Sequence, residues 1–309
     1  MSNALQLTSQ CNKLNVPVLN QPQLLYLLTE LSPGAAMAQT RMPLNFALVL
    51  DRSGSMSGAK LHTMKEAVKN IIDQLEPSDV ISIVMFDSSV QTLVPAQAAS
   101  DKHGLKRKVD TIDDGGATNM APALREGLSQ VGHNYTPDRI SRIVLLTDGE
   151  VTDEESDSRA EADRAGGMGI PVIGLGFGDG WKEDFVIDLA DRSVLAAPGS
   201  GTGKTDYIKT PNDAARIFQE VYQSMQVVAQ GVTLTYRLAQ GIEARRVWQV
   251  APMTRDVGLS SIQGQGRAIV VQVGDLEKTG MSYLVEMMCP PRPVGKVRLA
   301  QAEVEYNVH

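Results

Sequence analysis

The sequence has few of the residues on which disulfide-rich, zinc-binding and membrane-spanning proteins depend. Only two of its 309 residues are cysteines, Cys11 and Cys289, so a disulfide framework is excluded and buried free thiols are expected. The four histidines are scattered along the chain, without the spacing of a zinc site. No apolar run approaches the roughly 18 residues that a membrane-spanning helix requires.

Positive charge is also scarce. The chain has 29 Lys and Arg residues against 36 Asp and Glu, a net charge of −7. General binders of nucleic acid or of membrane surfaces normally carry a basic patch, so neither class is expected. The first residues, MSNALQLT, lack the charged and apolar regions of a signal peptide. The sequence therefore predicts a cytoplasmic protein without a membrane span, long enough for about two domains.

The middle of the chain alternates between buried strands and amphipathic helices. The strands expected there, each a continuous apolar run, are residues 44–50, 80–86, 142–147 and 170–176. The helix after the first strand keeps its apolar residues on one face and ends before Pro77. A later helix begins near Ala121, with Pro122 in its first turn. We expect an α/β domain over residues 43–228, with a doubly wound, mostly parallel sheet.

Both ends of the chain have the pattern of antiparallel strands. The N-terminal segment, residues 1–42, contains two strand-like runs, Leu14–Leu19 and Leu24–Leu28, which are too short to fold alone. The later candidates, separated by turn signals, are residues 232–238, 245–250, 268–273, 282–287 and 296–306. We expect one antiparallel β-sandwich built from residues 1–42 and 229–309, into which the α/β domain is inserted.

One carboxylate and two hydroxyls follow the first strand of the α/β domain at alternate positions. They are Asp51, Ser53 and Ser55, in the run DRSGSMS. Residues spaced two apart in an extended loop point to one side, and Gly54 lets the backbone bend, so the three side chains can converge on one ion. Oxygen ligands suit Mg²⁺ or Mn²⁺, and ligand sites in open α/β sheets lie at the carboxyl ends of strands.

Two further residues complete this set. Thr118 lies in the glycine-rich run GGATN, and Asp148 ends another apolar strand. Taken in this order, the five residues resemble the metal-ion-dependent adhesion site (MIDAS) of von Willebrand factor A (VWA) domains, over roughly residues 44–227. The resemblance implies that Ser53, Ser55 and Thr118 contact the metal, while Asp51 and Asp148 hold coordinating waters. Taken singly, each residue could equally be a helix cap or part of a turn.

Two other motifs have simpler explanations. The run Gly199–Thr205 is similar to a nucleotide-binding P-loop, but Pro198 stands where the first glycine is required and no long helix follows. A mobile glycine-rich hairpin before the last strand is expected instead. Thr152–Glu155 is a capping box that starts a helix rather than a calcium loop, and Thr210 starts the last helix in the same way.

No catalytic set is visible, because no nucleophile has a plausible histidine partner and the HExxH motif is absent. A metal held largely by neutral hydroxyls keeps a position open for an anion, most simply an Asp or Glu of a partner protein. We expect a non-enzymatic, metal-dependent protein-recognition module. The alternatives are a signalling protein that a kinase modifies at an exposed hydroxyl, with Thr118 as the candidate phosphosite, an accessory subunit of an ATPase or chelatase, and a Mg²⁺-dependent hydrolase.

Overall fold

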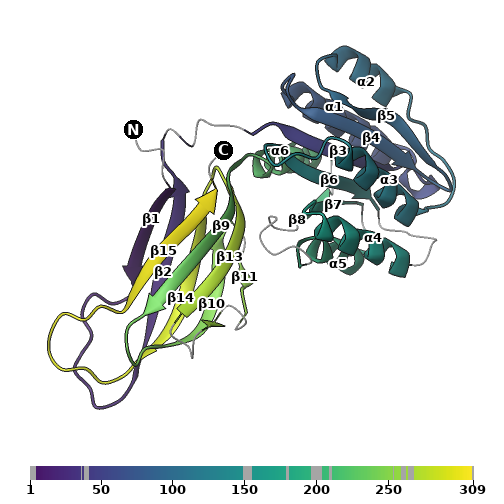
Figure 1. Ribbon diagram of the computed structural model, residues 1–309. Coiled ribbons are helices and arrows are strands. Elements are labelled where there is room, and N and C mark those ends of the chain that lie inside the picture. The colour runs from purple at the N-terminus through teal and green to yellow at the C-terminus, as the bar shows by residue number, and fades with distance from the viewer. Residues whose placement is uncertain are drawn as a thin grey trace. The chain divides into compact units, whose positions relative to one another are not determined.

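A computed structural model describes residues 5–35, 37, 42–148, 155–178, 181–195, 204–208, 211–252, 254–258, 262–263 and 268–307. The chain divides into two compact units, one formed by Met1–Arg41 with Val227–His309 and the other by Met42–Gln226. The second unit interrupts the first in sequence, as the colours of Figure 1 show. Among the described residues, no helix has the length and apolar character needed to cross a membrane.

The unit Met42–Gln226 is built on a six-stranded sheet in the order β5-β4-β3-β6-β7-β8. Its strands are β3 (Leu44–Asp51), β4 (Val80–Phe86), β5 (Val90–Ala98), β6 (Ile140–Thr147), β7 (Val172–Phe177) and β8 (Lys204–Ile208). Five of them run parallel, and β5 pairs antiparallel with β4. Strands β3, β4, β6 and β7 are buried along their whole length, which explains their continuous apolar runs. The predicted doubly wound, mostly parallel sheet is confirmed.

Helices pack on both faces of this sheet. They are α1 (Ala59–Gln74), α2 (Lys102–Asp110), α3 (Met120–Gly132), α4 (Glu155–Gly167), α5 (Glu183–Leu195) and α6 (Pro211–Ser224). Helix α1 packs against α2 and α6, whereas α3, α4 and α5 pack in succession over a core that includes Val49 and Leu145. Helix α1 ends before Pro77 and α3 holds Pro122 in its first turn, as predicted. The capping residue Thr152, the glycine-rich run before β8 and Thr210 lie outside the described residues.

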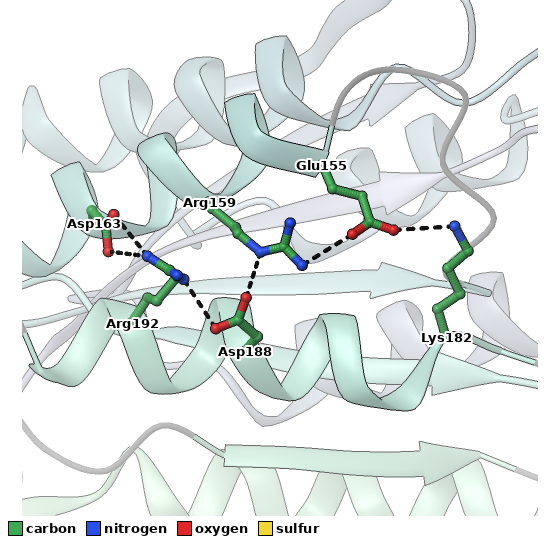
Figure 2. Close-up of polar contacts among 6 residues, drawn as sticks. All are labelled: Glu155, Arg159, Asp163, Lys182, Asp188 and Arg192. Carbon is green, nitrogen blue, oxygen red and sulfur yellow. Dashed lines mark hydrogen bonds and ion pairs between the residues drawn. The ribbon is translucent and has the colours of Figure 1, made fainter.

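Helices α4 and α5 are joined by a chain of six alternating charges (Figure 2). Arg159 lies at its centre, bonded through Nε to Asp188 Oδ2 at 2.6 Å and through a terminal nitrogen to Glu155 Oε2 at 3.0 Å. Lys182 extends the chain beyond Glu155, and Arg192 links Asp188 to Asp163. Burial raises the pKa of Asp188, but hydrogen bonds from Arg159 and Arg192 outweigh it and the pKa is lowered. These ion pairs therefore stabilise the fold at neutral pH and lose their effect in acid.

We expect Arg159→Met to lower the thermal unfolding midpoint modestly, because it breaks two ion pairs whose groups are about one-third exposed. The loss should shrink in about 1 M NaCl, which screens surface charges. Arg164→Met is the matched control, since Arg164 lies on the same helix but makes one longer contact, 3.7 Å, to Glu161. Equal losses in the two variants would contradict a specific contribution from the charge chain.

The unit Met1–Arg41 with Val227–His309 is a sandwich of two antiparallel sheets, β1-β2-β14-β10-β11 and β12-β13-β9-β15. Its strands are β1 (Leu5–Cys11), β2 (Gln23–Pro33), β9 (Val227–Leu238), β10 (Glu243–Ala251), β11 (Arg255–Asp256), β12 (Ile262–Gln263), β13 (Ala268–Glu277), β14 (Met281–Cys289) and β15 (Ala300–Asn307). Leu25 and Val285 of one sheet share a core with Leu234 and Ile269 of the other. Antiparallel sheets built from both chain ends were predicted, and this is confirmed.

Three details of the sandwich differ from the prediction. The run Leu14–Leu19 forms no strand but lies in the loop between β1 and β2, where Pro17 has no N–H to donate to a ladder. The last strand begins at Ala300 rather than at residue 296. Both cysteines are free, but only Cys289 is buried, because Cys11 ends the edge strand β1 and is half-exposed.

Candidate metal centre

Asp51 is the last residue of β3 and is fully buried. Its carboxylate accepts hydrogen bonds from the Ser53 backbone N–H at 2.9 Å and from Thr147 Oγ1 at 2.6 Å. Burial raises the pKa of Asp51 to about 6; the hydrogen bonds from Ser53 and Thr147 oppose this rise, and the charge of Asp148 adds to it. The fold thus holds an oriented carboxylate whose cost of burial the hydrogen bonds from Ser53 and Thr147 offset only in part.

Ser53 and Ser55 lie in the tight turn that follows. The turn is a 3₁₀ helix, η2 (Gly54–Met56), rather than the extended loop we expected. Its geometry still brings Ser53 Oγ and Ser55 Oγ to within 3.1 Å of each other. The fully buried side chain of Met56 anchors the turn against the core. The two serine hydroxyls therefore converge beside the end of β3.

The loop that carries Thr118 is bonded directly to this turn. The backbone N–H of Gly54 donates to the carbonyl of Gly116 at 2.9 Å, and that of Gly115 donates to the carbonyl of Arg52 at 2.6 Å. Thr118 is only 3% exposed and directly precedes Asn119, the N-cap residue of α3. Two backbone hydrogen bonds thus fix the position of Thr118 relative to the serines.

Asp87, directly after β4, positions the same loop. Its side chain pairs with Arg52 at 2.8 Å, and its backbone carbonyl accepts from the N–H of Asn119 at 2.9 Å. A Cβ on Gly115 would lie 1.9 Å from Asp87 Oδ2, so glycine is required at that position. Asp87 was not among the predicted site residues, although it follows a predicted strand just as the two site aspartates do.

Asp148 follows β6, the neighbour of β3 in the sheet, and is buried. Its Oδ2 accepts a hydrogen bond from Lys60 Nζ at 2.9 Å, and Lys60 comes from the first turn of α1. A cationic group therefore already lies against this carboxylate. No sequence pattern indicates this contact, since the two residues are 88 positions apart.

The five residues offer hydroxyl and carboxylate oxygens, a donor set that fits a hard divalent cation. The Lys60 ammonium against Asp148 shows that the site accepts a positive charge. Nowhere in the described part of the chain do three His, Cys, Asp or Glu side chains gather as a metal cluster. A metal at this site would therefore depend on Ser53, Ser55 and Thr118 as well as on the two aspartates.

The hydroxyls are less accessible than we expected. Ser53 is 2% exposed and Thr118 is 3% exposed, whereas Ser55 is half-buried. The expectation of an exposed hydroxyl is wrong for Thr118, and Ser53 is buried as well. The reason is the pair of backbone hydrogen bonds that ties the two loops together.

Comparison with known proteins finds relatives in sequence and in fold. Residues 45–198 match the model of the von Willebrand factor type A domain. The chain is 32% identical over 243 residues to the uncharacterized protein sll0103 of Synechocystis sp., an alignment that covers 76% of this chain. Since it covers 54% of that protein, the chain spans about half the length of this relative.

Two solved structures share the fold. One is von Willebrand factor type A from Catenulispora acidiphila, with a TM-score of 0.73 and 19% identity over 98% of this chain and 70% of that chain. The other is proximal thread matrix protein 1 from the mussel byssus, with a zinc-occupied MIDAS motif; its TM-score is 0.52, with 18% identity over 62% of this chain and 50% of that chain.

Proposed function

Because residues 45–198 form a von Willebrand factor type A domain, we propose that this chain is a divalent-metal-dependent protein-recognition module. Domains of this family commonly mediate metal-dependent protein–protein interactions. The observation that carries the proposal is the convergence of hydroxyls and buried carboxylates at the carboxyl ends of β3 and β6. The residues that we assign to the metal are Asp51, Ser53, Ser55, Thr118 and Asp148.

We assign Ser53, Ser55 and Thr118 as direct ligands of Mg²⁺ or Mn²⁺, and Asp51 and Asp148 as acceptors for metal-bound waters. A bound ion would offer a coordination position to an Asp or Glu carboxylate of a partner protein. Asp51 is already oriented by its two hydrogen bonds, so its carboxylate needs no rotation. Neither histidine nor cysteine belongs to this set, and we assign it binding rather than catalysis. The mussel protein's MIDAS holds zinc, so zinc belongs among the metals to be tested.

The alternatives have less support. Phosphorylation of Thr118 would require a kinase to reach a side chain that is 3% exposed. No contact in the described site favours an ATPase accessory role or a hydrolase. Recovery of an ATPase in the pull-down below would support the first, and Mg²⁺-dependent phosphatase or nuclease activity of the purified chain would support the second. A cytoplasmic location remains part of the proposal.

We expect calorimetric titration to detect Mg²⁺ or Mn²⁺ binding to the wild type and at least about tenfold weaker binding to Thr118→Val, which loses one ligand hydroxyl at similar volume. Thr111→Val, at the end of α2, is the matched control. A lysate pull-down with and without EDTA then identifies the protein that leaves when the metal is removed. Unchanged metal affinity in Thr118→Val would contradict the ligand assignment.

Lys60→Met is expected to strengthen Mg²⁺ binding about five- to tenfold, because the Lys60 ammonium competes with the metal for the buried Asp148 carboxylate. A charge pair at this distance is worth about 1 kcal/mol even where water screens it fully. Lys69→Met is the control, since Lys69 lies on the same helix but pairs with Glu66 and Asp110. Weaker or unchanged Mg²⁺ binding in Lys60→Met would show that Lys60 does not compete.

A further inference from the structure

Two loops emerge together from one end of the β-sandwich. Residues 12–22 lead into β2 and residues 290–299 follow β14; these strands are paired, with Cys289 opposite Gln23. Figure 1 shows them as the purple and yellow loops at the lower end of the sandwich. We call residues 12–22 and 290–299 the loop pair.

The loop pair carries charge of one sign only. Its charged residues are Lys13, Arg292, Lys296 and Arg298, with no Asp or Glu in either loop. Lys13, Lys296 and Arg298 are exposed. In a chain of net charge −7, this end is therefore a local basic surface that the overall charge conceals.

The same loops also expose large aliphatic side chains. Leu14 and Val294 are each 89% exposed and Val18 is 58% exposed. Of the eight large apolar side chains exposed in the described part of the chain, five lie in the loop pair. Val16 and Leu299 of the same loops pack against the sandwich core instead. Each loop is thus anchored inward while its apolar tips point to solvent.

The loops are also held in shape. Pro17 O accepts a hydrogen bond from Gln23 Nε2 at 2.8 Å, the Ala239 N–H donates to Leu299 O at 2.9 Å, and Arg292 donates to the Gln240 carbonyl. The loop pair contains five prolines, namely Pro17, Pro22, Pro290, Pro291 and Pro293. Restricted loops lose little conformational entropy when they bind.

We propose that the loop pair docks on a membrane surface that contains anionic phospholipids. The basic side chains are attracted to anionic headgroups, and the aliphatic tips leave water by entering the boundary between headgroups and acyl chains. Separate aliphatic tips flanked by basic residues suit a lipid surface better than a protein partner, since protein hot spots favour Trp, Tyr and Arg in packed pockets. This docking is independent of the metal centre.

The test is co-sedimentation of the full 309-residue chain with phosphatidylcholine vesicles, with and without phosphatidylserine, in EDTA at low salt. The chain should bind only the vesicles that contain phosphatidylserine and should be released in about 1 M NaCl. Because EDTA removes divalent metal, failure of the metal proposal does not affect this result. Binding to phosphatidylcholine alone, or no vesicle binding, overturns the proposal.

Substitutions locate the surface. Lys296→Gln with Arg298→Gln should lower vesicle partitioning about 25-fold, since each basic residue near an anionic surface contributes about fivefold. Arg107→Gln with Lys108→Gln removes two exposed charges at the end of α2 and should change partitioning little. Equal losses in the two double variants overturn the assignment of the surface.

The apolar tips are tested in the same way. Val294→Ser should weaken partitioning, whereas Met168→Ser, at an exposed apolar residue of the other unit, should not. Sedimentation velocity of the wild type provides the competing outcome. Self-association that Val294→Ser abolishes, without vesicle binding, would assign the loop pair to a second copy of the chain and overturn the lipid proposal.

Discussion

A fragment of residues 42–226 should fold alone, whereas a fragment of residues 227–309 should not. The first fragment keeps a complete six-stranded sheet with its helices. The second loses β1 and β2, and β2 lies between β1 and β14 in its sheet. We therefore propose that residues 1–41 and 227–309 form one folding domain into which the α/β unit is inserted.

The energies indicate that the loss of β2 is decisive. Leu25, Leu27 and Leu31 of β2 are each buried in the sandwich core. Burying three leucines contributes roughly 5–9 kcal/mol, at roughly 1.5–3 kcal/mol each. The net stability of a domain is only about 5–15 kcal/mol, so this loss alone is comparable to the whole. The unpaired edge of β14 would in addition favour aggregation.

Urea unfolding followed by circular dichroism and fluorescence measures the outcome for each fragment. The matched control is a fusion of residues 1–41 to residues 227–309 through a flexible linker, which should unfold cooperatively because both sheets are restored. Cooperative unfolding of 227–309 by itself would refute the proposal of one domain built from both ends.

How well the sequence predicted each strand depended on the surroundings of that strand. The parallel strands β3, β4, β6 and β7 are buried on both faces, so their apolar runs are unbroken and recognisable. The edge strand β5 is half-exposed and contains Pro95, and no apolar pattern marks it. Leu14–Leu19 has a strand-like composition, but its apolar side chains are largely exposed in a loop, which composition alone cannot show.

The sequence indicates only part of the geometry of the candidate site. The spacing of Asp51, Ser53 and Ser55 marks a site within one turn, because all three are neighbours in sequence. The contact of Thr147 with Asp51 spans 96 positions and depends on the pairing of β3 with β6. The raised pKa of Asp51 likewise follows from burial, which only the folded structure reveals.

Asp51→Asn should abolish Mg²⁺ binding and yet stabilise the metal-free protein at neutral pH. The pKa of Asp51 is about 6 in the fold against an ordinary value of 3.8, a difference worth about 3 kcal/mol. Because the folded-state pKa is raised, this cost is fully present above pH 6 or so, shrinks as the pH falls, and vanishes below 3.8. The asparagine carries no charge and loses one good acceptor for Ser53 or Thr147, at a cost of about 1 kcal/mol. The net gain is therefore about 2 kcal/mol.

Thermal unfolding in EDTA at several pH values measures this gain. The wild type should approach Asp51→Asn in stability as the pH falls from 7 toward 4, because protonation removes the buried charge. Acid-sensitive ion pairs such as Arg159–Asp188 weaken equally in the wild type and in Asp51→Asn. The difference in stability between these two proteins therefore reports on Asp51. Asp114→Asn, at an exposed position of the neighbouring loop, controls for the loss of a surface charge.

Mg²⁺ should reverse the order of the two proteins. The metal stabilises the wild type, which binds it, and leaves Asp51→Asn unchanged. The apparent Mg²⁺ affinity of the wild type should also be about tenfold lower at pH 5 than at pH 7, because protons compete for Asp51 below its pKa of about 6. If Asp51→Asn is less stable than the wild type in EDTA at pH 7, the uncompensated charge is not the dominant energy of this site. If Mg²⁺ stabilises both proteins equally, Asp51 does not take part in metal binding.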